Sequence, residues 1–353
     1  MLTPKERLYK ALRRQEVDRT PCICPGGMMN MIVEDVMDKT GCKWPEAHSD
    51  ATLMAKLSAG MYEFGGFENY GVPFCMTVEA EAMGAPIIIG SKVNEPRIAE
   101  YPINSVTEWS RLKNIELPGI VGEEKIIKDS NVQVGGRIEV VLDAIKILKV
   151  KNDGVPIIGN LTGPVSLASS LVDPTTFYKE IIRKREASHQ FMEFVTDNLI
   201  AFGKAQIEAG ADVITISDPS ATGEILGPKL FAEYGVKYIN RIAKELRPLC
   251  KTGFIIHICG RLKSIYKELN ELESEAISFD SITSVKEARG TVNNKSIMGN
   301  VSTLALEENT PEQIEEITRY CIASGANILS PACGIGPKTP MENIKAMVKA
   351  CQK

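Results

Sequence analysis

Three side chains of metal-binding types stand at or just after apolar stretches of the sequence. His257 and Cys259 are two positions apart at the end of one such stretch, and Cys333 follows much later within Ser-Pro-Ala-Cys-Gly. Because alternate residues of an extended strand face the same side, His257 and Cys259 could aim at one point. An imidazole and two thiolates suit zinc, and three protein ligands leave a fourth position open for a substrate. The residue types therefore predict a catalytic zinc site, provided that the fold brings Cys333 to the other two.

Other cysteines and histidines are weaker candidates. Cys22 and Cys24 have the same spacing of two, but no histidine accompanies them, which favours core packing. The nine cysteines are odd in number and scattered, which argues against a disulfide framework and for a reducing compartment. His48 and His189 are expected on the surface or on a helix face. Three methionines are expected to fill gaps in the core rather than to bind a ligand: Met28, Met29 and Met31.

Eight short apolar stretches are predicted to be strands, and helical patterns separate most of them. The predicted strands are residues 20–24, 72–77, 156–160, 212–216, 253–257, 276–279, 296–299 and 326–329. Alternating strands and helices imply parallel strands with right-handed crossovers, and eight such units close into a barrel. The predicted fold class is therefore α/β, a (β/α)8 TIM barrel; a seven-stranded open sheet is the alternative.

One domain, residues 1–353, is predicted, with residues 1–70 as an N-terminal helical extension that includes the first strand. The first helix has a capping box, because Thr3 and Glu6 stand three positions apart with a proline between them. Residues 84–135 are expected to be an irregular insertion. Helices are predicted over residues 3–12, most of 28–63, 139–151, 174–209, 228–246, 261–269, 284–288, 311–324 and from 341 onward.

The composition is that of an ordinary globular protein. Hydrophobic residues make up 44% of the chain and charged residues 24%. The net charge of −4 indicates no basic surface for nucleic acid. No apolar run approaches the ~20 residues of a membrane-spanning helix. The charged N-terminus does not look like a signal peptide, so we expect a cytoplasmic protein.

A barrel would also position the predicted metal ligands. Active sites of such barrels lie at the C-terminal ends of the strands. His257 and Cys259 would end the fifth strand, and Cys333 would follow the eighth, so that all three meet at one rim. Three carboxylates are candidates for the fourth metal position or for another catalytic role: Asp218 after strand four, and Glu79 and Glu81 after strand two.

The His-x-Cys pair with a distant cysteine resembles the zinc-binding signature of the methylcobamide:coenzyme M methyltransferases, within the uroporphyrinogen decarboxylase superfamily. Supporting segments spread over nearly the whole chain, at residues 3–7, 18–21, 77–84, 159–164 and 210–219. The metal-binding set is the specific part of the resemblance, whereas the other segments identify the superfamily. Uroporphyrinogen decarboxylases carry arginines just after strand one. The corresponding residues 24–30 contain none, so porphyrinogen decarboxylation is not expected.

The resemblance implies methyl transfer from a methylated corrinoid to a thiol such as coenzyme M, with zinc held by His257, Cys259 and Cys333. The thiol would bind as thiolate and attack the methyl group of methyl-cobalt(III), which leaves cobalt(I). The sequence has no Asp-x-His-x-x-Gly motif, so the corrinoid must arrive free or on a partner protein. Glycine-rich turns would let the donor approach, a turn at Asn160 could supply amides to an anionic acceptor, and Lys338 could supply charge. The predicted cofactor-binding residues are Gly26, Gly27, Asn160 and Gly336.

Three alternatives remain open from the sequence. The methyl acceptor could be tetrahydrofolate or a thiol other than coenzyme M. The protein could be a metal-free, decarboxylase-like lyase. It could also be a non-enzymatic module that docks a corrinoid protein or senses a methyl donor.

Overall fold

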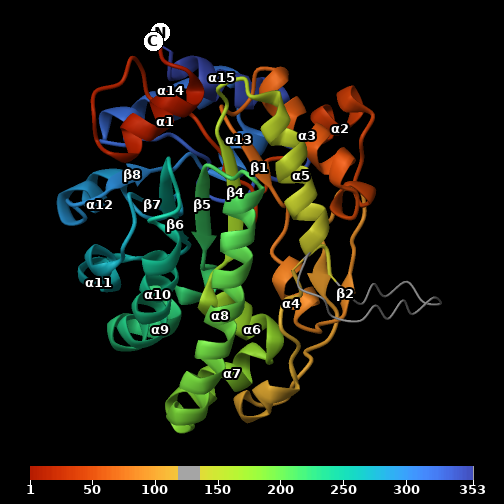
Figure 1. Ribbon diagram of the computed structural model, residues 1–353. Helices are drawn as coiled ribbons and strands as arrows, with labels where there is room; N and C mark the ends of the chain where they lie inside the picture. The colour runs from red at the N-terminus through yellow and green to blue at the C-terminus, as the bar shows by residue number, and fades with distance from the viewer. Residues whose placement is uncertain (118–135, 353) are drawn as a thin grey trace.

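The centre of the protein is a parallel sheet whose strands follow one another in chain order (Figure 1). The computed structural model describes residues 1–117 and 136–352. Six strands pair in the order β1, β4, β5, β6, β7, β8. Their bounds are β1 Tyr70–Val72, β4 Ile157–Thr162, β5 Val213–Ser217, β6 Gly253–Ile258, β7 Ala276–Phe279 and β8 Ser296–Met298.

Two further extended stretches lie between β8 and β1 without enough regular pairing to count as strands. Ile328 bridges Met298 at the end of β8, and the next residue, Leu329, bridges Cys22 in parallel. The stretches around Cys22 and Ile328 therefore occupy the positions of the first and eighth predicted strands. With them the sheet has the eight parallel positions of a (β/α)8 barrel, as the sequence predicts.

Side chains complete the closure between the Cys22 stretch and β1. The Cys22 amide donates to the Glu68 carboxylate at 3.0 Å, and the Glu68 amide donates to the Cys22 carbonyl at 2.8 Å. Asn69 accepts from the Cys24 amide at 2.9 Å and donates to the Cys24 carbonyl at 2.8 Å. These bonds satisfy buried backbone groups that a regular ladder would otherwise pair.

Helices cover the outside of the sheet (Figure 1). Their bounds are α1 Pro4–Leu12, α2 Glu34–Thr40, α3 Ala51–Glu63, α4 Val78–Ala82, α5 Ile138–Lys151, α6 Pro164–Leu171, α7 Pro174–Arg183, α8 Arg185–Ala209, α9 Gly223–Leu230, α10 Lys237–Leu246, α11 Tyr266–Glu271, α12 Val285–Thr291, α13 Thr303–Glu308, α14 Pro311–Ala323 and α15 Met341–Ala350. Short 3-10 or π turns are η1 Glu46–His48, η2 Val106–Arg111, η3 Pro219–Ala221, η4 Phe231–Val236 and η5 Lys263–Ile265. The capping box at α1 is present as predicted.

The predicted helical pattern is wrong in two places. Residues 28–33 form no helix, and all but Met28 are buried. The long helix predicted over 174–209 breaks at Lys184, whose φ of −124° and ψ of 50° lie outside the helical range. Three short helices were not predicted from the sequence: α4 and α6, which follow the ends of β1 and β4, and α13, which follows β8.

A hairpin made of β2 Ile87–Ile88 and β3 Arg97–Ile98 lies outside the main sheet. It belongs to the predicted insertion, of which residues 118–135 lie outside the described residues. None of the helices in the described ranges is both long and apolar enough to span a lipid bilayer.

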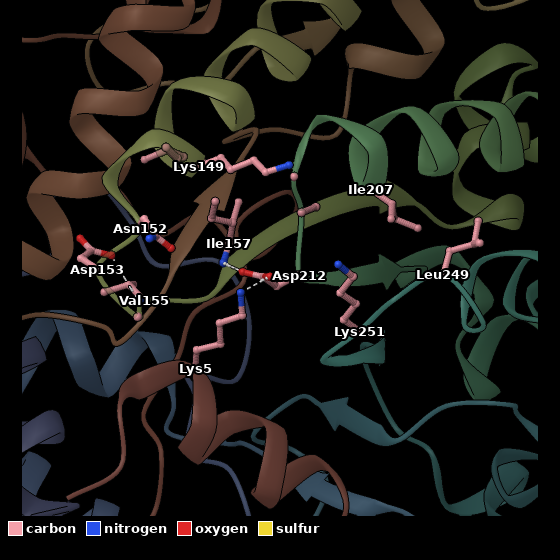
Figure 2. A pocket seen from close by; sticks show the side chains of 14 residues that line it. Lys5, Lys149, Asn152, Asp153, Val155, Ile157, Ile207, Asp212, Leu249 and Lys251 are labelled. Atoms are coloured by element: carbon pink, nitrogen blue, oxygen red, sulfur yellow. Dashed lines mark hydrogen bonds and ion pairs between the residues drawn. The ribbon is translucent and has the colours of Figure 1, made fainter.

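A cavity of about 260 Å³ opens at the amino ends of β4 and β5 (Figure 2). It therefore lies at the end of the barrel opposite to the rim formed by the carboxyl ends of the strands. Asp212 lies in it, accepts from the Ile157 amide at 3.0 Å and pairs with Lys5. Lys149 and Lys251 also line the cavity, but no histidine or cysteine is among its described lining residues. This end of the barrel therefore ties strands together and carries none of the predicted metal ligands.

Candidate metal centre

The structure brings together the three residues that the sequence singles out. The donor atoms of His257, Cys259 and Cys333 all lie within 4.8 Å of one another. His257 Nε2 is 3.0 Å from Cys259 Sγ, which is 3.7 Å from Cys333 Sγ. Within the described parts of the chain, this is the one group of three or more histidines, cysteines and carboxylates close enough to hold a metal ion.

Local backbone features place each side chain of the cluster. His257 lies in β6, and Cys259 follows directly after this strand, so the spacing of two keeps both on one face. Gly260 then turns the chain with a φ of +77°, and a Cβ there would lie 2.6 Å from Thr222 Oγ1. Next to Cys333, a Cβ on Gly334 would lie 2.5 Å from a backbone carbonyl oxygen. Glycine at both positions lets the two cysteine loops pack closely at the rim.

Burial separates these two cysteines from the other seven. Cys259 and Cys333 are half-buried, whereas all other cysteines of the chain are buried. His257 has no exposed surface. A metal ion and a substrate can therefore reach the two sulfur atoms from solvent, while the imidazole supports them from the barrel interior. Cys22 and Cys24 pack in the core, in agreement with the favoured interpretation.

The two thiols share protons unequally. The hydrogen bond from Cys259 lowers the pKa of the Cys333 thiol. The same bond to Cys333, together with burial, raises the pKa of the Cys259 thiol. The shared hydrogen bond therefore makes the first proton of the coupled pair easier to lose than the second. A thiolate is the form of cysteine that binds metal ions.

The donor set also fits the dimensions of a zinc site. Two thiolates on tetrahedral zinc, each about 2.3 Å from the metal, lie about 3.8 Å apart. The Cys259–Cys333 sulfur separation of 3.7 Å matches this value. A nitrogen and a sulfur ligand of zinc lie about 3.5 Å apart. The His257–Cys259 contact of 3.0 Å would therefore open by a few tenths of an ångström.

Asp218 is placed away from this cluster. It follows Ser217, whose side chain is on the same face of the sheet as that of its register partner His257. The Asp218 carboxylate accepts from the Val165 amide at 3.1 Å, and from the amide and hydroxyl of Ser166 at 2.8 and 2.6 Å. These bonds satisfy the first turn of α6, and burial raises the pKa of Asp218 to about 6. Its oxygens therefore hold a helix end.

Glu79 is also engaged within the protein. It accepts from the Thr162 amide at 2.7 Å and from the Thr162 hydroxyl at 3.0 Å, which ties α4 to the end of β4. Burial raises the pKa of Glu79 to about 7, although both hydrogen bonds favour the ionised form. Glu79 therefore links α4, which follows the second barrel strand, to the carboxyl end of β4, the third barrel strand.

Glu81 forms a buried ion pair with Arg137, with 2.7 Å between Oε2 and Nε. Arg137 also donates to Cys75 Sγ at 3.2 Å and to Thr77 Oγ1 at 2.6 Å. Burial raises the pKa of Glu81, and its Oε1 atom is buried without a hydrogen-bond partner. Among the described residues, neither Glu79, Glu81 nor Asp218 joins the metal-binding cluster.

The predicted cofactor-binding residues fall into two groups. Asn160 donates to the backbone carbonyls of Pro25 and Val72 at 2.9 and 3.0 Å, so it lies behind the turn at Gly26 and Gly27. A Cβ on Gly27 would lie 2.7 Å from the Asn160 Cβ, so this group is tightly packed and buried. Gly336, by contrast, is half-buried in the loop that follows Cys333.

Two residues that interact with the cluster could not be found from local sequence patterns. The hydroxyl of Ser278 lies 2.9 Å from His257 Nδ1, a contact between neighbouring strands that no local motif signals. Glu95, on the hairpin of β2 and β3, is half-buried. Burial raises its pKa to about 8, and the charges of Cys75 and Cys333 contribute.

The expectation for one of the other two histidines is wrong. His48 is fully buried rather than exposed, and its ring contacts those of Trp44 and Phe74 at centroid distances of 4.6 and 6.3 Å. His189 lies on α8 as expected and bonds Tyr238 at 2.7 Å. Both are therefore held by contacts outside the metal-binding cluster.

Comparison with known proteins agrees with the resemblance carried by the motifs. Residues 3–353 match the profile of the uroporphyrinogen decarboxylase (URO-D) family. The chain is 34% identical over 353 residues to the methylcobamide:CoM methyltransferase MtbA of Methanosarcina acetivorans, covering 99% of this chain and 98% of that protein. It is 33% identical over 352 residues to the methylcobamide:CoM methyltransferase MtaA of Methanosarcina barkeri, covering 99% and 97%.

A solved structure gives the same result for the fold. The chain matches a methyltransferase from Methanosarcina mazei with a TM-score of 0.87 at 33% sequence identity, covering 99% of this chain and 98% of that one. The similarity therefore extends over all the strands and helices that build the rim. This chain belongs to the uroporphyrinogen decarboxylase family and, within it, to the group of the methylcobamide:CoM methyltransferases.

Proposed function

We propose that this methyltransferase moves a methyl group from a methylated corrinoid to a small thiol, with zinc held by His257, Cys259 and Cys333. The corrinoid is free or carried by a partner protein. The thiol is of the coenzyme M class, which the names of the relatives state for those proteins. One observation carries the proposal: three donors of the types that zinc prefers converge within 4.8 Å at the C-terminal rim of the barrel.

Each residue of the cluster has a separate task. Cys333 ionises more readily than Cys259, because the hydrogen bond from Cys259 lowers its pKa. Cys259 gives up its proton when a divalent ion takes the place of that hydrogen bond. Two thiolates and a neutral imidazole then balance the charge of the ion. When bound, zinc would lower the pKa of the acceptor thiol, so that the reactive thiolate exists at neutral pH.

The methyl transfer itself balances without a further reactant. The acceptor thiol loses its proton to solvent, and its sulfur attacks the methyl carbon of methyl-cobalt(III). The carbon–sulfur bond forms while the cobalt–carbon bond breaks, and the electron pair of that bond stays on cobalt, which becomes cobalt(I). The half-buried side of Cys259 and Cys333 is the side from which both substrates approach. Gly336 is the accessible member of the predicted cofactor-binding set.

A turnover assay on the purified protein tests the proposal. The protein is analysed for zinc and mixed with methylcobalamin and, separately, coenzyme M, another small thiol or tetrahydrofolate. The change in corrinoid absorbance reports loss of the methyl group. We expect about one zinc per chain, as a single three-ligand site holds one ion, and turnover with a thiol acceptor.

Two variants control the assay. His257→Ala should lose zinc and turnover, whereas Cys250→Ala, which removes a buried thiol on the strand-start side of β6, should keep both. A zinc-free protein whose activity is unchanged by His257→Ala would support the metal-free lyase alternative. A zinc-loaded protein without turnover on any acceptor would support the docking or sensing module. A cytoplasmic location stays a prediction from the sequence.

A further inference from the structure

His257 is the middle member of a row of three residues on neighbouring strands. The register pairs Ser217 of β5 with His257 of β6, and His257 with Ser278 of β7. Register partners in a sheet present their side chains to the same face, so both serines flank the imidazole. Both serines are buried as well. Only the Ser278 hydroxyl bonds the ring, at 2.9 Å from Nδ1, whereas Ser217 Oγ has no hydrogen-bond partner.

A fourth residue offers the Ser278 hydroxyl a second acceptor. Ser278 Oγ lies 3.9 Å from Met29 Sδ, and a thioether sulfur can only accept a hydrogen bond. A Ser278 hydrogen directed at Met29 leaves the lone pairs of the hydroxyl oxygen facing His257. In that arrangement Nδ1 of His257 carries a hydrogen and donates it to Ser278 across 2.9 Å.

This arrangement decides which ring nitrogen is free. A neutral imidazole carries one N–H, so a hydrogen on Nδ1 leaves the lone pair on Nε2. Nε2 is the nitrogen that lies 3.0 Å from Cys259 Sγ and faces the metal-binding cluster. We propose that Ser278 is a positioning residue that holds His257 in the tautomer and ring orientation needed for metal binding, with Met29 orienting the Ser278 hydroxyl.

The proposal rests on the proposed function for the identity of the metal, but not for the tautomer. Outer partners of metal-binding histidines fix the ring and raise its basicity, and their removal costs about 10- to 100-fold in metal affinity. Because Ser278 is fully buried, water does not replace its hydroxyl in the variant Ser278→Ala. The ring then loses its hydrogen-bond partner at Nδ1 and can take either tautomer.

The first experiment measures zinc affinity by competition with a chromophoric chelator. Ser278→Ala should bind zinc about 10- to 100-fold more weakly than the wild-type protein. Ser217→Ala is the matched control, because it removes an equal hydroxyl on the other side of His257 that makes no bond to the ring. Its zinc affinity should not change. Equal losses in both variants, or none in Ser278→Ala, would overturn the proposal.

The second experiment reads the tautomer directly in the metal-free protein. The chain has three histidines, so the ¹⁵N imidazole spectrum is simple, and His257→Gln identifies the signals of this ring by their loss. In the wild-type protein above neutral pH, His257 should carry its hydrogen on Nδ1. In Ser278→Ala it should shift toward a mixture of both tautomers. A wild-type ring protonated on Nε2 would contradict the proposal outright.

Two conservative variants keep the test decisive if Ser278→Ala folds poorly. Ser278→Thr retains the hydroxyl and should restore the Nδ1–H tautomer. Met29→Leu removes the acceptor of the Ser278 hydroxyl at similar volume, and should weaken the tautomer preference without touching the ring. A wild-type protein with the expected tautomer but no zinc affinity would refute the proposed function and leave the tautomer assignment intact.

Discussion

The sulfur atoms of Cys259 and Cys333 lie 3.7 Å apart, although 74 positions of the chain separate the two residues. Cys259 follows β6, and Cys333 follows the stretch at Ile328 that occupies the eighth barrel position. Closure of the barrel is therefore what makes them neighbours. Because their hydrogen bond lowers the pKa of the Cys333 thiol, the pair is suited to bind a divalent cation.

Replacing either cysteine should remove the metal and keep the fold. Cys259→Ser and Cys333→Ser should each lose most bound zinc and most methyl transfer, because a serine hydroxyl is a poor zinc ligand beside a thiolate. The large buried core does not depend on the ion, so circular dichroism and the unfolding midpoint should stay close to those of the wild-type protein. Loss of secondary structure in these variants would instead make the metal structural.

Replacing Asp218 should affect stability and not metal content. Asp218→Asn keeps the shape but turns one acceptor oxygen into a donor that faces the amides of Val165 and Ser166. The free energy of unfolding should fall by about 1–3 kcal/mol, the usual cost of a buried polar group left unsatisfied. Chemical denaturation and elemental analysis measure the two quantities. A loss of zinc in Asp218→Asn would show that this carboxylate acts on the metal site.

The titration of Glu79 predicts a pH dependence of stability. Its pKa rises from 4.5 to about 7 on folding, so the folded protein prefers the protonated carboxyl. The resulting stabilisation is complete below pH 4.5 and is lost as the pH rises through 7. The difference amounts to about 3 kcal/mol. Between pH 5 and 8 the unfolding free energy of the wild-type protein should therefore fall more than that of Glu79→Gln.

Glu79→Gln is the comparison that isolates this effect, since other carboxyls titrate in the same range. Glutamine is neutral at every pH and can still accept from the Thr162 amide. Denaturation curves at several pH values give both profiles. Parallel profiles for the two proteins would mean that the pKa of Glu79 does not change on folding.

Breaking the buried pair of Glu81 and Arg137 should be costly. Arg137→Met leaves the Glu81 carboxylate buried without its cation, which typically costs about 3–5 kcal/mol of stability. The double variant Glu81→Gln/Arg137→Met removes the unpaired charge and should recover part of that loss. Urea denaturation of both single variants and the double variant gives the coupling free energy. Strictly additive effects would show that the two side chains stabilise the protein independently.

The sequence was sufficient for the fold class because the signals for strands and helices are local. Apolar stretches of four to six residues, the capping box at Thr3 and the crossover rule all act within short segments, and the eight positions of the barrel followed from them. The first and eighth positions differ in detail. At the first position Glu68 and Asn69 add side-chain bonds to the backbone pairing, and at the eighth only isolated bridges form, features that no periodic pattern records.

The residues of the site also fall into two groups, those placed by local sequence and those placed only by tertiary contacts. The types of His257 and Cys259 and their spacing of two were enough to place them on one face, because side-chain alternation along a strand needs no knowledge of the rest of the chain. The nearness of Cys333, the turn of Asp218 toward α6 and the bond from His257 to Ser278 depend on strand register and on packing between distant segments. Those contacts exist only once the barrel has closed, since residues far apart in the chain have no reason to meet until the core brings them together.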